Sequence, residues 1–230
     1  RVNDFLKGSE GAYGILVEAT MKVFRHLPGN RQRFAVMFPS WDAAIEASRE
    51  IVQGEFGLPA VYRISDPEET EIGLKLKGFD QPLFDRLLRS RGLAAGSRCL
   101  CIGTAEGEIG YARHVKKMAL AIARKHGATS LTGFATKQWE HGRYSDVHMR
   151  DDLLDYGIVI DTLETGVTWG NLRRVYEGAR AVVKLRPRTL CMTHCSHFYG
   201  QGTNLYFIFI LRPESEDEFV RFRAGIVDKI

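Results

Sequence analysis

Apolar residues recur along this chain with two periods, and segments of the two kinds alternate. Short apolar runs, typical of buried strands, lie at 33–38, 59–64, 99–104, 158–163, 188–195 and 203–211. Longer segments with helical periodicity lie at 41–53, 67–91, 111–125, 168–183 and 215–230. The pattern therefore predicts a chain in which strands and helices alternate along the sequence.

Residue types that begin helices support several of these boundaries. Ser40, Asp66 and Thr168 each stand where a helical pattern starts, and their side chains can accept hydrogen bonds from the free N–H groups of a first helical turn. Pro67 directly follows Asp66, and proline suits the first helical position. We therefore expect these three side chains to cap helices.

The connection between the last two strands decides the sheet type. The segments 188–195 and 203–211 are joined by a short turn containing Gly200 and Gly202, and so short a link joins only antiparallel strands. An antiparallel β-sheet carrying helices on one face fits better than a doubly wound parallel sheet. The prediction is an α+β fold with two ferredoxin-like halves.

Composition and charge narrow the function classes. The 230 residues are 44% hydrophobic and 26% charged, as in ordinary globular proteins. Lys and Arg number 32 against 28 Asp and Glu, an excess too small and too dispersed to indicate a nucleic-acid binder. No window approaches the roughly 18 apolar residues that a membrane span needs. A cytoplasmic protein with small-molecule partners is expected.

The four cysteines form two close pairs, Cys99 with Cys101 and Cys191 with Cys195. Both pairs lie in apolar strand segments, which predicts buried, reduced thiols. A zinc site would favour C-x-x-C spacing or nearby histidines, and only the second pair has histidines, His194 and His197, beside it. No metal is expected.

A glycine-rich segment near the start is the first candidate for chemistry. Gly8, Gly11 and Gly14 recur every third residue and precede a loosely alternating run, Ile15 to Val23, that predicts a strand. Such glycines let a backbone approach a phosphate or a ring closely. The segment has neither the Walker nor the dinucleotide spacing, so a ligand loop and a tight structural turn both remain open.

A polar aromatic stretch at residues 139–152 is the second candidate. It combines Trp, His, Arg, Tyr and Asp side chains, and either Arg143 or Arg150 could bind an anionic substrate in a bidentate way. The alternative is a salt-bridged surface helix in which Asp151 and Asp152 are simply the partners of Arg150.

The last hairpin supplies the third candidate. In a strand, Asn204 and Tyr206 share one face, and His194 lies in the neighbouring segment. A tyrosine beside polar groups could act as acid or base, or it could be buried and bonded to backbone. Arg63, in the strand 59–64, is either an ion-pair partner of Asp66 or a buried functional cation.

Together these segments resemble the flavin-linked oxidases of the vanillyl-alcohol oxidase type, most closely the alkyldihydroxyacetonephosphate synthases among them. Residues 8–15, Gly-Ser-Glu-Gly-Ala-Tyr-Gly-Ile, are similar to the family's G-S-E-G-T-L-G-I/V, with Ala12 and Tyr13 in place of Thr and Leu. Residues 59–63 are similar to its P-A-S-x-R. Met149-Arg150-Asp151, then Glu164-Thr165 and Trp169, match its R-D, E-T and W series.

This resemblance implies an FAD enzyme that exchanges the acyl chain of acyl-dihydroxyacetone phosphate for a fatty alcohol through an adduct at flavin N5. It implies Tyr206 and Arg63 as catalytic residues, and Arg150, His194 and Asn204 as substrate-binding residues. The residues it implies for cofactor binding are Glu10, Gly11, Ala12, Tyr13, Gly14 and Ile15.

The resemblance also implies a domain division. Residues 1–30 would form the C-terminal edge of an FAD-binding domain, and residues 31–230 the substrate-binding cap, ending before the family's His-rich loop. Because Arg1 is not an initiator Met and the final helix reaches Ile230 without a Gly or Asn cap, we expect a fragment that is inactive alone. A homodimer and peripheral membrane contact through lipid substrates are implied as well.

Two other functions stay open. A D-2-hydroxyacid dehydrogenase of the same superfamily would carry H-x-G-D-G-N-x-H in the hairpin, but this chain has Gln201 for the Asp and Tyr206 for the second His. A non-catalytic ligand-binding module on a ferredoxin-like sheet is the alternative from another class.

Overall fold

The computed structural model describes residues 2–145 and 147–229. Arg1, Asp146 and Ile230, which fall within predicted segments, lie outside these ranges. The strands are β1 (Gln32–Phe38), β2 (Val61–Ser65), β3 (Cys99–Ala105), β4 (Thr129–Leu131), β5 (Val159–Thr168), β6 (Leu190–Cys195), β7 (Phe198–Tyr199) and β8 (Gly202–Leu211). The helices are α1 (Val2–Leu6), α2 (Trp41–Gln53), α3 (Pro67–Leu76), α4 (Pro82–Arg89), α5 (Ile109–Lys125), α6 (Phe134–Gly142), α7 (Met149–Leu154), α8 (Leu172–Lys184) and α9 (Glu216–Val227).

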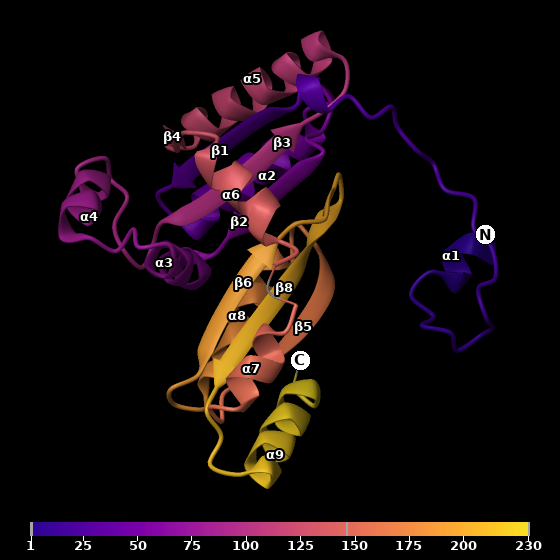
Figure 1. Cartoon of the computed structure of the whole chain (residues 1–230), viewed down its shortest axis with the longest axis vertical. Helices are drawn as coiled ribbons and strands as arrows, with labels where there is room; N and C mark the ends of the chain where they lie inside the picture. Colours follow the sequence, from indigo (N-terminus) through magenta and orange to yellow (C-terminus); the bar gives the residue numbers. More distant parts are fainter. Residues whose placement is uncertain (1, 146, 230) are drawn as a thin grey trace.

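Seven of these strands form one continuous sheet in the order β4-β1-β3-β2-β6-β8-β5, and β7 pairs with the start of β8. Every pairing is antiparallel. The prediction of an α+β fold with an antiparallel sheet flanked by helices is confirmed. Figure 1 shows the sheet running along the long axis of the molecule.

The sheet consists of two related halves. The first runs β1-α2-β2-β3-α5-β4 with strand order β4-β1-β3-β2, which is the ferredoxin-like arrangement. The second runs β5-α8-β6-β8-α9 and repeats three of the four strand positions. Strands β2 and β6, which hold the same position in the two halves, pair through Ile64 with Cys195 and Ser65 with His194.

One face of the sheet carries the main core. Side chains alternate between the two faces of a strand, and Phe38, Ile64, Phe207 and Phe209 all point to the face covered by α2, α5, α8 and α9, where they are at most 2% exposed. All four cysteines point to the same face and are buried and unpaired, as predicted. Burial raises the pKa of the Cys191 thiol to about 11, which keeps it protonated.

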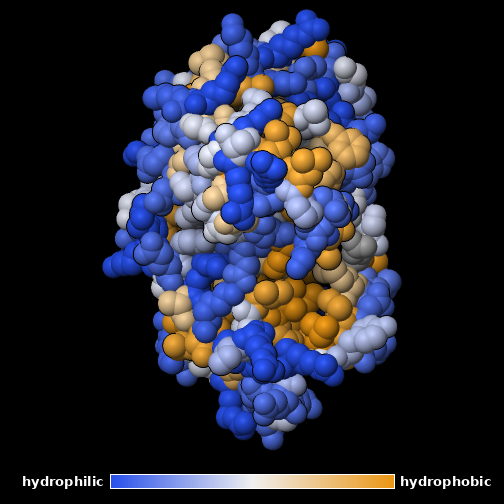
Figure 2. All heavy atoms as spheres, turned by 90° about the vertical axis from the view of Figure 1, so that its left-hand side faces the viewer, coloured by the Kyte–Doolittle hydropathy of each residue, from blue (hydrophilic) through white to orange (hydrophobic). Residues whose placement is uncertain are grey.

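Helices lie on the opposite face as well, so the expectation of helices on one face alone is wrong. Helix α6 packs on β1 and β3 there, with Thr136 Oγ1 donating to the Phe34 carbonyl. Coverage of the second half is thinner, and Leu190 on this face is 40% exposed. Figure 2 shows apolar surface gathered in a hollow on the lower half of the molecule.

Two of the three predicted helix caps are confirmed. Ser40 Oγ accepts the Ala43 N–H at 3.2 Å, and Asp66 Oδ1 accepts the Glu69 N–H at 2.8 Å. The third is wrong, because Thr168 is the last residue of β5 and pairs with Gly202, so that α8 begins only at Leu172. Hydrogen bonding across the sheet continues past the point where the apolar pattern stops.

The predicted strand Ile15–Val23 is also wrong. Residues 15–27 have neither helix nor strand structure, and Ile15 and Val17 are 91% and 92% exposed. A strand forms only when a neighbour satisfies its backbone hydrogen bonds, and no described segment lies beside this one. Figure 1 shows residues 2–27 extending away from the sheet.

Among residues 2–145 and 147–229, no helix is both long and apolar enough to cross a membrane.

Candidate functional site

Four chemically active side chains form one row across the lightly covered face of the sheet. Ser65 of β2 pairs with His194 of β6, His194 pairs with Tyr206 of β8, and Tyr206 pairs with Glu164 of β5. Directly paired residues point to the same face, and Arg63 shares that face with Ser65. We call Arg63, His194, Tyr206 and Glu164 the polar row.

An ion pair joins the first two members of the polar row to a helix. Arg63 Nη2 lies 2.6 Å from Oε1 of Glu69, in the first turn of α3, and 3.0 Å from His194 Nδ1. The same Glu69 oxygen lies 3.1 Å from His194 Nδ1. The side chains of Arg63, Glu69 and His194 are only 20%, 12% and 13% exposed. Each of the three therefore fixes the other two.

Electrostatics keep Glu69 ionised at this position. Burial would raise the pKa of the Glu69 carboxyl, but the positive charge of Arg63 and the hydrogen bond from His194 outweigh burial and hold the pKa below its usual value. A buried carboxylate that accepts two charged or polar donors binds them more strongly than a neutral acceptor would. The site therefore contains a permanent negative charge beside a permanent positive one.

Tyr206 joins the polar row through its ring. The imidazole of His194 and the phenol of Tyr206 are stacked, with centroids 4.9 Å apart and planes inclined by 22°. Tyr206 is partly buried, so its ring is held while part of the side chain remains accessible. This placement is compatible with the predicted acid/base role.

Asn204 lies on the same face but is engaged in holding the hairpin. Its Oδ1 accepts the N–H groups of Ser196 and His197 at 3.1 and 3.0 Å, and its Nδ2 donates to Glu164 Oε1. The side chain is therefore occupied by protein contacts. A substrate-binding role for Asn204 stays a prediction.

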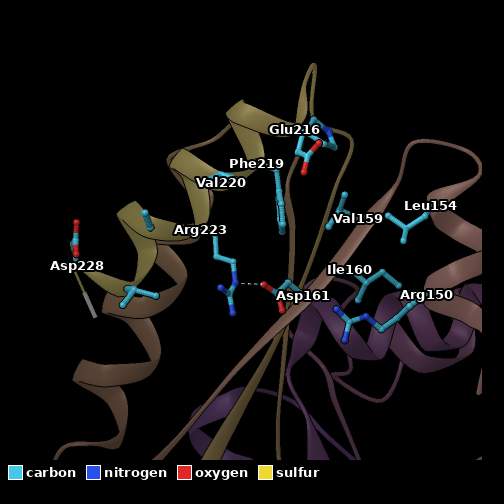
Figure 3. Close-up of a pocket in the computed structure, with 13 residues that line it drawn as sticks. Arg150, Leu154, Val159, Ile160, Asp161, Glu216, Phe219, Val220, Arg223 and Asp228 are labelled. Carbon is cyan, nitrogen blue, oxygen red and sulfur yellow. Dashed lines mark hydrogen bonds and ion pairs between the residues drawn. The ribbon is translucent and has the colours of Figure 1, made fainter.

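Arg150 lies apart from the polar row. It is exposed on α7 and lines a groove of about 860 Å³ between α7, the start of β5 and α9. Figure 3 shows it next to Ile160, while Arg223 pairs with Asp161 at 2.7 Å. Ile160 precedes Glu164 by four residues, or about 13 Å along a strand. The structure thus brings His194 and Tyr206 together, and places Arg150 farther along the same sheet.

Two other charged groups of the 139–152 stretch, Glu140 and Arg143, have local partners. Glu140 pairs with Arg33 at 2.7 Å and accepts from Thr104 at 3.0 Å on the lightly covered face. Arg143 packs over the rings of Trp139 and Tyr144. Within the described residues Arg150 forms no ion pair, so the pairing with Asp151 or Asp152 considered from the sequence is not present.

Asp66 does not pair with Arg63, so that alternative is wrong. Its carboxylate caps α3, accepts from Tyr176 at 3.1 Å and pairs with Arg180 at 2.6 Å. Burial raises the pKa of Asp66 to about 6, an effect that Arg180 only partly offsets. The partner of Arg63 is Glu69, which the sequence analysis missed.

The glycine loop predicted to contact FAD is exposed and open. Gly8, Glu10 and Gly11 have positive φ angles of 78°, 49° and 84°, and an added Cβ at Gly8 or Gly14 would meet no atom within 4 Å. Such a backbone can approach a flat or phosphorylated group without side-chain obstruction. Glu10, Gly11, Ala12, Tyr13, Gly14 and Ile15 are therefore available to a cofactor, although none contacts the polar row here.

We also searched the described residues for side chains that could bind a metal ion. Among the residues that the structure describes, no group of three or more His, Cys, Asp or Glu side chains could hold a metal ion. His197, beside the second cysteine pair, is exposed, whereas Cys195 is buried on the core face.

Comparison with known proteins places this geometry in a family. The family model described as "FAD linked oxidases, C-terminal domain" matches residues 27–230. The chain belongs to this family. FAD is the family's cofactor.

Individual relatives agree with this membership. The alkyldihydroxyacetonephosphate synthase of Dictyostelium discoideum is 29% identical over 229 residues, which is 94% of this chain and 37% of that protein. The synthase of Trypanosoma brucei brucei is 24% identical over 237 residues, 96% of this chain and 38% of that protein.

Solved structures give the same fold. An alkyldihydroxyacetonephosphate synthase structure superposes with a TM-score of 0.79 at 28% identity, covering 100% of this chain and 44% of the other. A 4-ethylphenol oxidase from Gulosibacter chungangensis shares the fold at 11% identity, with a TM-score of 0.54. The chain thus spans less than half the length of these relatives.

Proposed function

We propose that this chain is the substrate-side part of an FAD enzyme that exchanges the acyl chain of acyl-dihydroxyacetone phosphate for a fatty alcohol. The observation that supports it best is the polar row, in which His194 contacts both Arg63 and Tyr206 on a lightly covered sheet face. The relatives named as alkyldihydroxyacetonephosphate synthases support the reaction class.

The reaction would exchange groups at one substrate carbon. The bond from that carbon to the acyloxy oxygen breaks, and the fatty acid leaves as a carboxylate. The oxygen of the fatty alcohol then bonds to the same carbon and releases a proton, so no electrons are gained or lost overall. Bound FAD would supply an electron sink for this exchange.

The chain's own residues suit the remaining tasks. Tyr206 would remove a proton from the substrate through its phenol oxygen and return it. The bond from one nitrogen to Glu69 fixes the position of the Arg63 guanidinium. Its remaining N–H groups can donate to an anionic substrate. His194, between the two, would orient the substrate together with Tyr206.

Arg150 is proposed as a second phosphate-binding cation. Its exposed guanidinium lacks an ion-pair partner among the described residues, and it lies at a groove on the sheet that carries the polar row. A substrate with a phosphate at one end and a long chain at the other could extend from the polar row toward this groove. Asn204 is proposed to bind substrate from the same sheet face as Tyr206, with its side chain held by the hairpin contacts.

The chain's arrangement suggests where the cofactor-bearing part of the protein belongs. We propose that residues 1–30 are the edge of the FAD-binding domain and residues 31–230 the cap. Residues 2–27 extend from the sheet with exposed apolar side chains, including Leu16 and Phe24, each 81% exposed. Only Arg25 links this segment to the sheet domain by an ion pair, with Glu108, among the described residues.

A direct assay separates the candidate reactions. The protein that carries this chain would be incubated with FAD, acyl-dihydroxyacetone phosphate and a fatty alcohol, and the ether product and released fatty acid measured. A parallel assay would offer D-lactate and 2-hydroxyglutarate with a dye acceptor. Ether product is expected; turnover of the hydroxyacids alone would contradict the proposal, and binding without turnover in both assays would favour the non-catalytic module.

Partners and location are part of the same proposal. A homodimer in the cytoplasm that touches membranes peripherally would suit a protein with lipid substrates. Light scattering of the purified protein would give its mass in solution, and sedimentation with phospholipid vesicles would detect the membrane contact. The mass of a monomer would contradict the proposed homodimer. A protein that stays in the supernatant when vesicles are sedimented would contradict the proposed membrane contact.

A further inference from the structure

Glu69 connects the polar row to the helix layer. Its Oε1 lies 2.6 Å from Arg63 Nη2 and 3.1 Å from His194 Nδ1, and it comes from α3 rather than from any strand of the row. The charged or titratable groups in contact with His194 within the described residues are Arg63 from β2, Glu69 from α3 and Tyr206 from β8. Any change in Glu69 therefore acts directly on His194.

We propose that Glu69 is a positioning residue that accepts a hydrogen bond from the Nδ1–H of His194, fixes the imidazole against Tyr206 and leaves Nε2 as a hydrogen-bond acceptor. This inference rests on the proposed function only in giving Tyr206 an acid/base role. The tautomer of His194 depends only on the neighbouring side chains and can be measured whether or not the proposed reaction takes place.

The choice of tautomer follows from the two neighbours of Nδ1. Arg63 can only donate and the Glu69 carboxylate can only accept. With a proton on Nδ1, His194 donates a charge-assisted hydrogen bond to an ionised carboxylate, which is a stronger acceptor than a neutral ring nitrogen. Arg63 keeps its 2.6 Å contact to the same oxygen, and its 3.0 Å approach to Nδ1 then joins two donors and forms no hydrogen bond. Without that proton, the Nδ1 lone pair would face the carboxylate oxygen at 3.1 Å.

The arrangement also restrains Tyr206. A histidine held by one hydrogen bond at Nδ1 has a defined ring plane, and the phenol ring of Tyr206 lies almost parallel to that plane. If Glu69 were neutral, the imidazole could turn and the stacked phenol would lose a fixed neighbour. Misplacing a reacting group by about 1 Å can cost on the order of 100-fold in rate.

The test compares Glu69→Gln with Glu71→Gln in the protein that carries this chain. Glu71 lies on the same helix and forms a comparable ion pair with Arg98, at 2.7 Å, without touching His194. Nitrogen NMR of the histidine rings, with His194 assigned by a His194→Gln variant, reports the tautomer of His194. Steady-state kinetics with acyl-dihydroxyacetone phosphate reports kcat and KM.

In the unaltered protein we expect the Nδ1–H tautomer of His194. Glu69→Gln should weaken the hydrogen bond from Nδ1–H, because a neutral amide oxygen is a weaker acceptor than a carboxylate, lower the share of the Nδ1–H tautomer and lower kcat about tenfold or more with a smaller change in KM. Glu71→Gln should leave all of these unchanged.

The proposal is wrong if the unaltered protein shows the Nε2–H tautomer, or if Glu69→Gln leaves the tautomer of His194 as it was. The first measurement needs no variant, so a failure of Glu69→Gln to fold would not leave the matter open. If the NMR results are as expected but no ether product forms, the positioning role stands and the proposed reaction fails.

Discussion

The imidazole ring of His194 is stacked on the phenol ring of Tyr206, with their centroids 4.9 Å apart. The two residues are direct partners on β6 and β8, so the register of the sheet itself creates the contact. Glu69 binds both this histidine and Arg63, and so ties the ring to α3 and β2. The proposed acid/base residue is therefore held by elements from both halves of the fold.

Replacing Tyr206 with Phe should separate chemistry from structure. The phenylalanine ring keeps the stacking with His194 and removes only the hydroxyl, so the free energy of unfolding should change by no more than about 0.5 kcal/mol. Turnover of acyl-dihydroxyacetone phosphate should fall by at least about 100-fold, the usual contribution of a positioned acid or base. Tyr199→Phe, in the exposed part of the hairpin, is the matched control and should keep full activity. Retained turnover with bound FAD in Tyr206→Phe would exclude the acid/base role.

Replacing Asn204 with Ala should mainly affect stability. The change leaves the N–H groups of Ser196 and His197 without their acceptor, and an unsatisfied buried donor costs about 1–3 kcal/mol. We expect a loss of about 2 kcal/mol in chemical denaturation. Asn171→Ala removes an exposed amide and serves as control. Unchanged stability combined with a raised KM would instead show that Asn204 binds substrate without holding the hairpin.

The local signals in the sequence predicted most of the framework correctly. Ser40 and Asp66 were readable as caps because their effect depends only on the residues directly after them. The apolar run Ile15–Val23 has an equally clear local pattern, yet it forms no strand. Whether an apolar run becomes a strand depends on a partner elsewhere, and local pattern carries no information about that partner.

The candidate site could be predicted only in part, because its contacts too depend on segments far apart in the sequence. Asp66 and Glu69 have the spacing of a capping box, in which the glutamate would turn back toward the helix start, so nothing local set Glu69 apart. Its side chain binds Arg63 and His194 because the β2–β6 pairing brings residues 131 positions apart into contact. The only local indication of the Arg63–Glu69 ion pair was that an arginine at the end of a predicted strand lies six residues before a glutamate in the first turn of the next helix.

Gly202 is the position where a methyl group should disturb the hairpin most directly. A Cβ there would be driven onto the carbonyl oxygen of Val167 and within 2.9 Å of the Thr168 Cα, and backbone atoms cannot turn aside as side chains do. Gly202→Ala should destabilise the protein by about 2–3 kcal/mol. Gly200→Ala, two residues earlier in open space, should have almost no effect on denaturation. Equal stability of the two variants would contradict the close approach of β5 and β8.

Asp66 should give the protein's stability a recognisable pH dependence. The carboxyl has an ordinary pKa of 3.8, and burial raises it to about 6 in the folded protein. Between these pH values the folded protein holds a proton that the unfolded chain has released, so stability falls as the pH rises from about 4 to about 6 and stays lower above. A shift of about two units corresponds to about 3 kcal/mol. Asp66→Asn cannot titrate, so relative to this variant the unaltered protein should lose up to about 3 kcal/mol between pH 4 and 7 in urea denaturation. Glu71→Gln, on the same helix, should show no such relative change, and a difference between the protein and Asp66→Asn that is independent of pH would refute the assignment to Asp66.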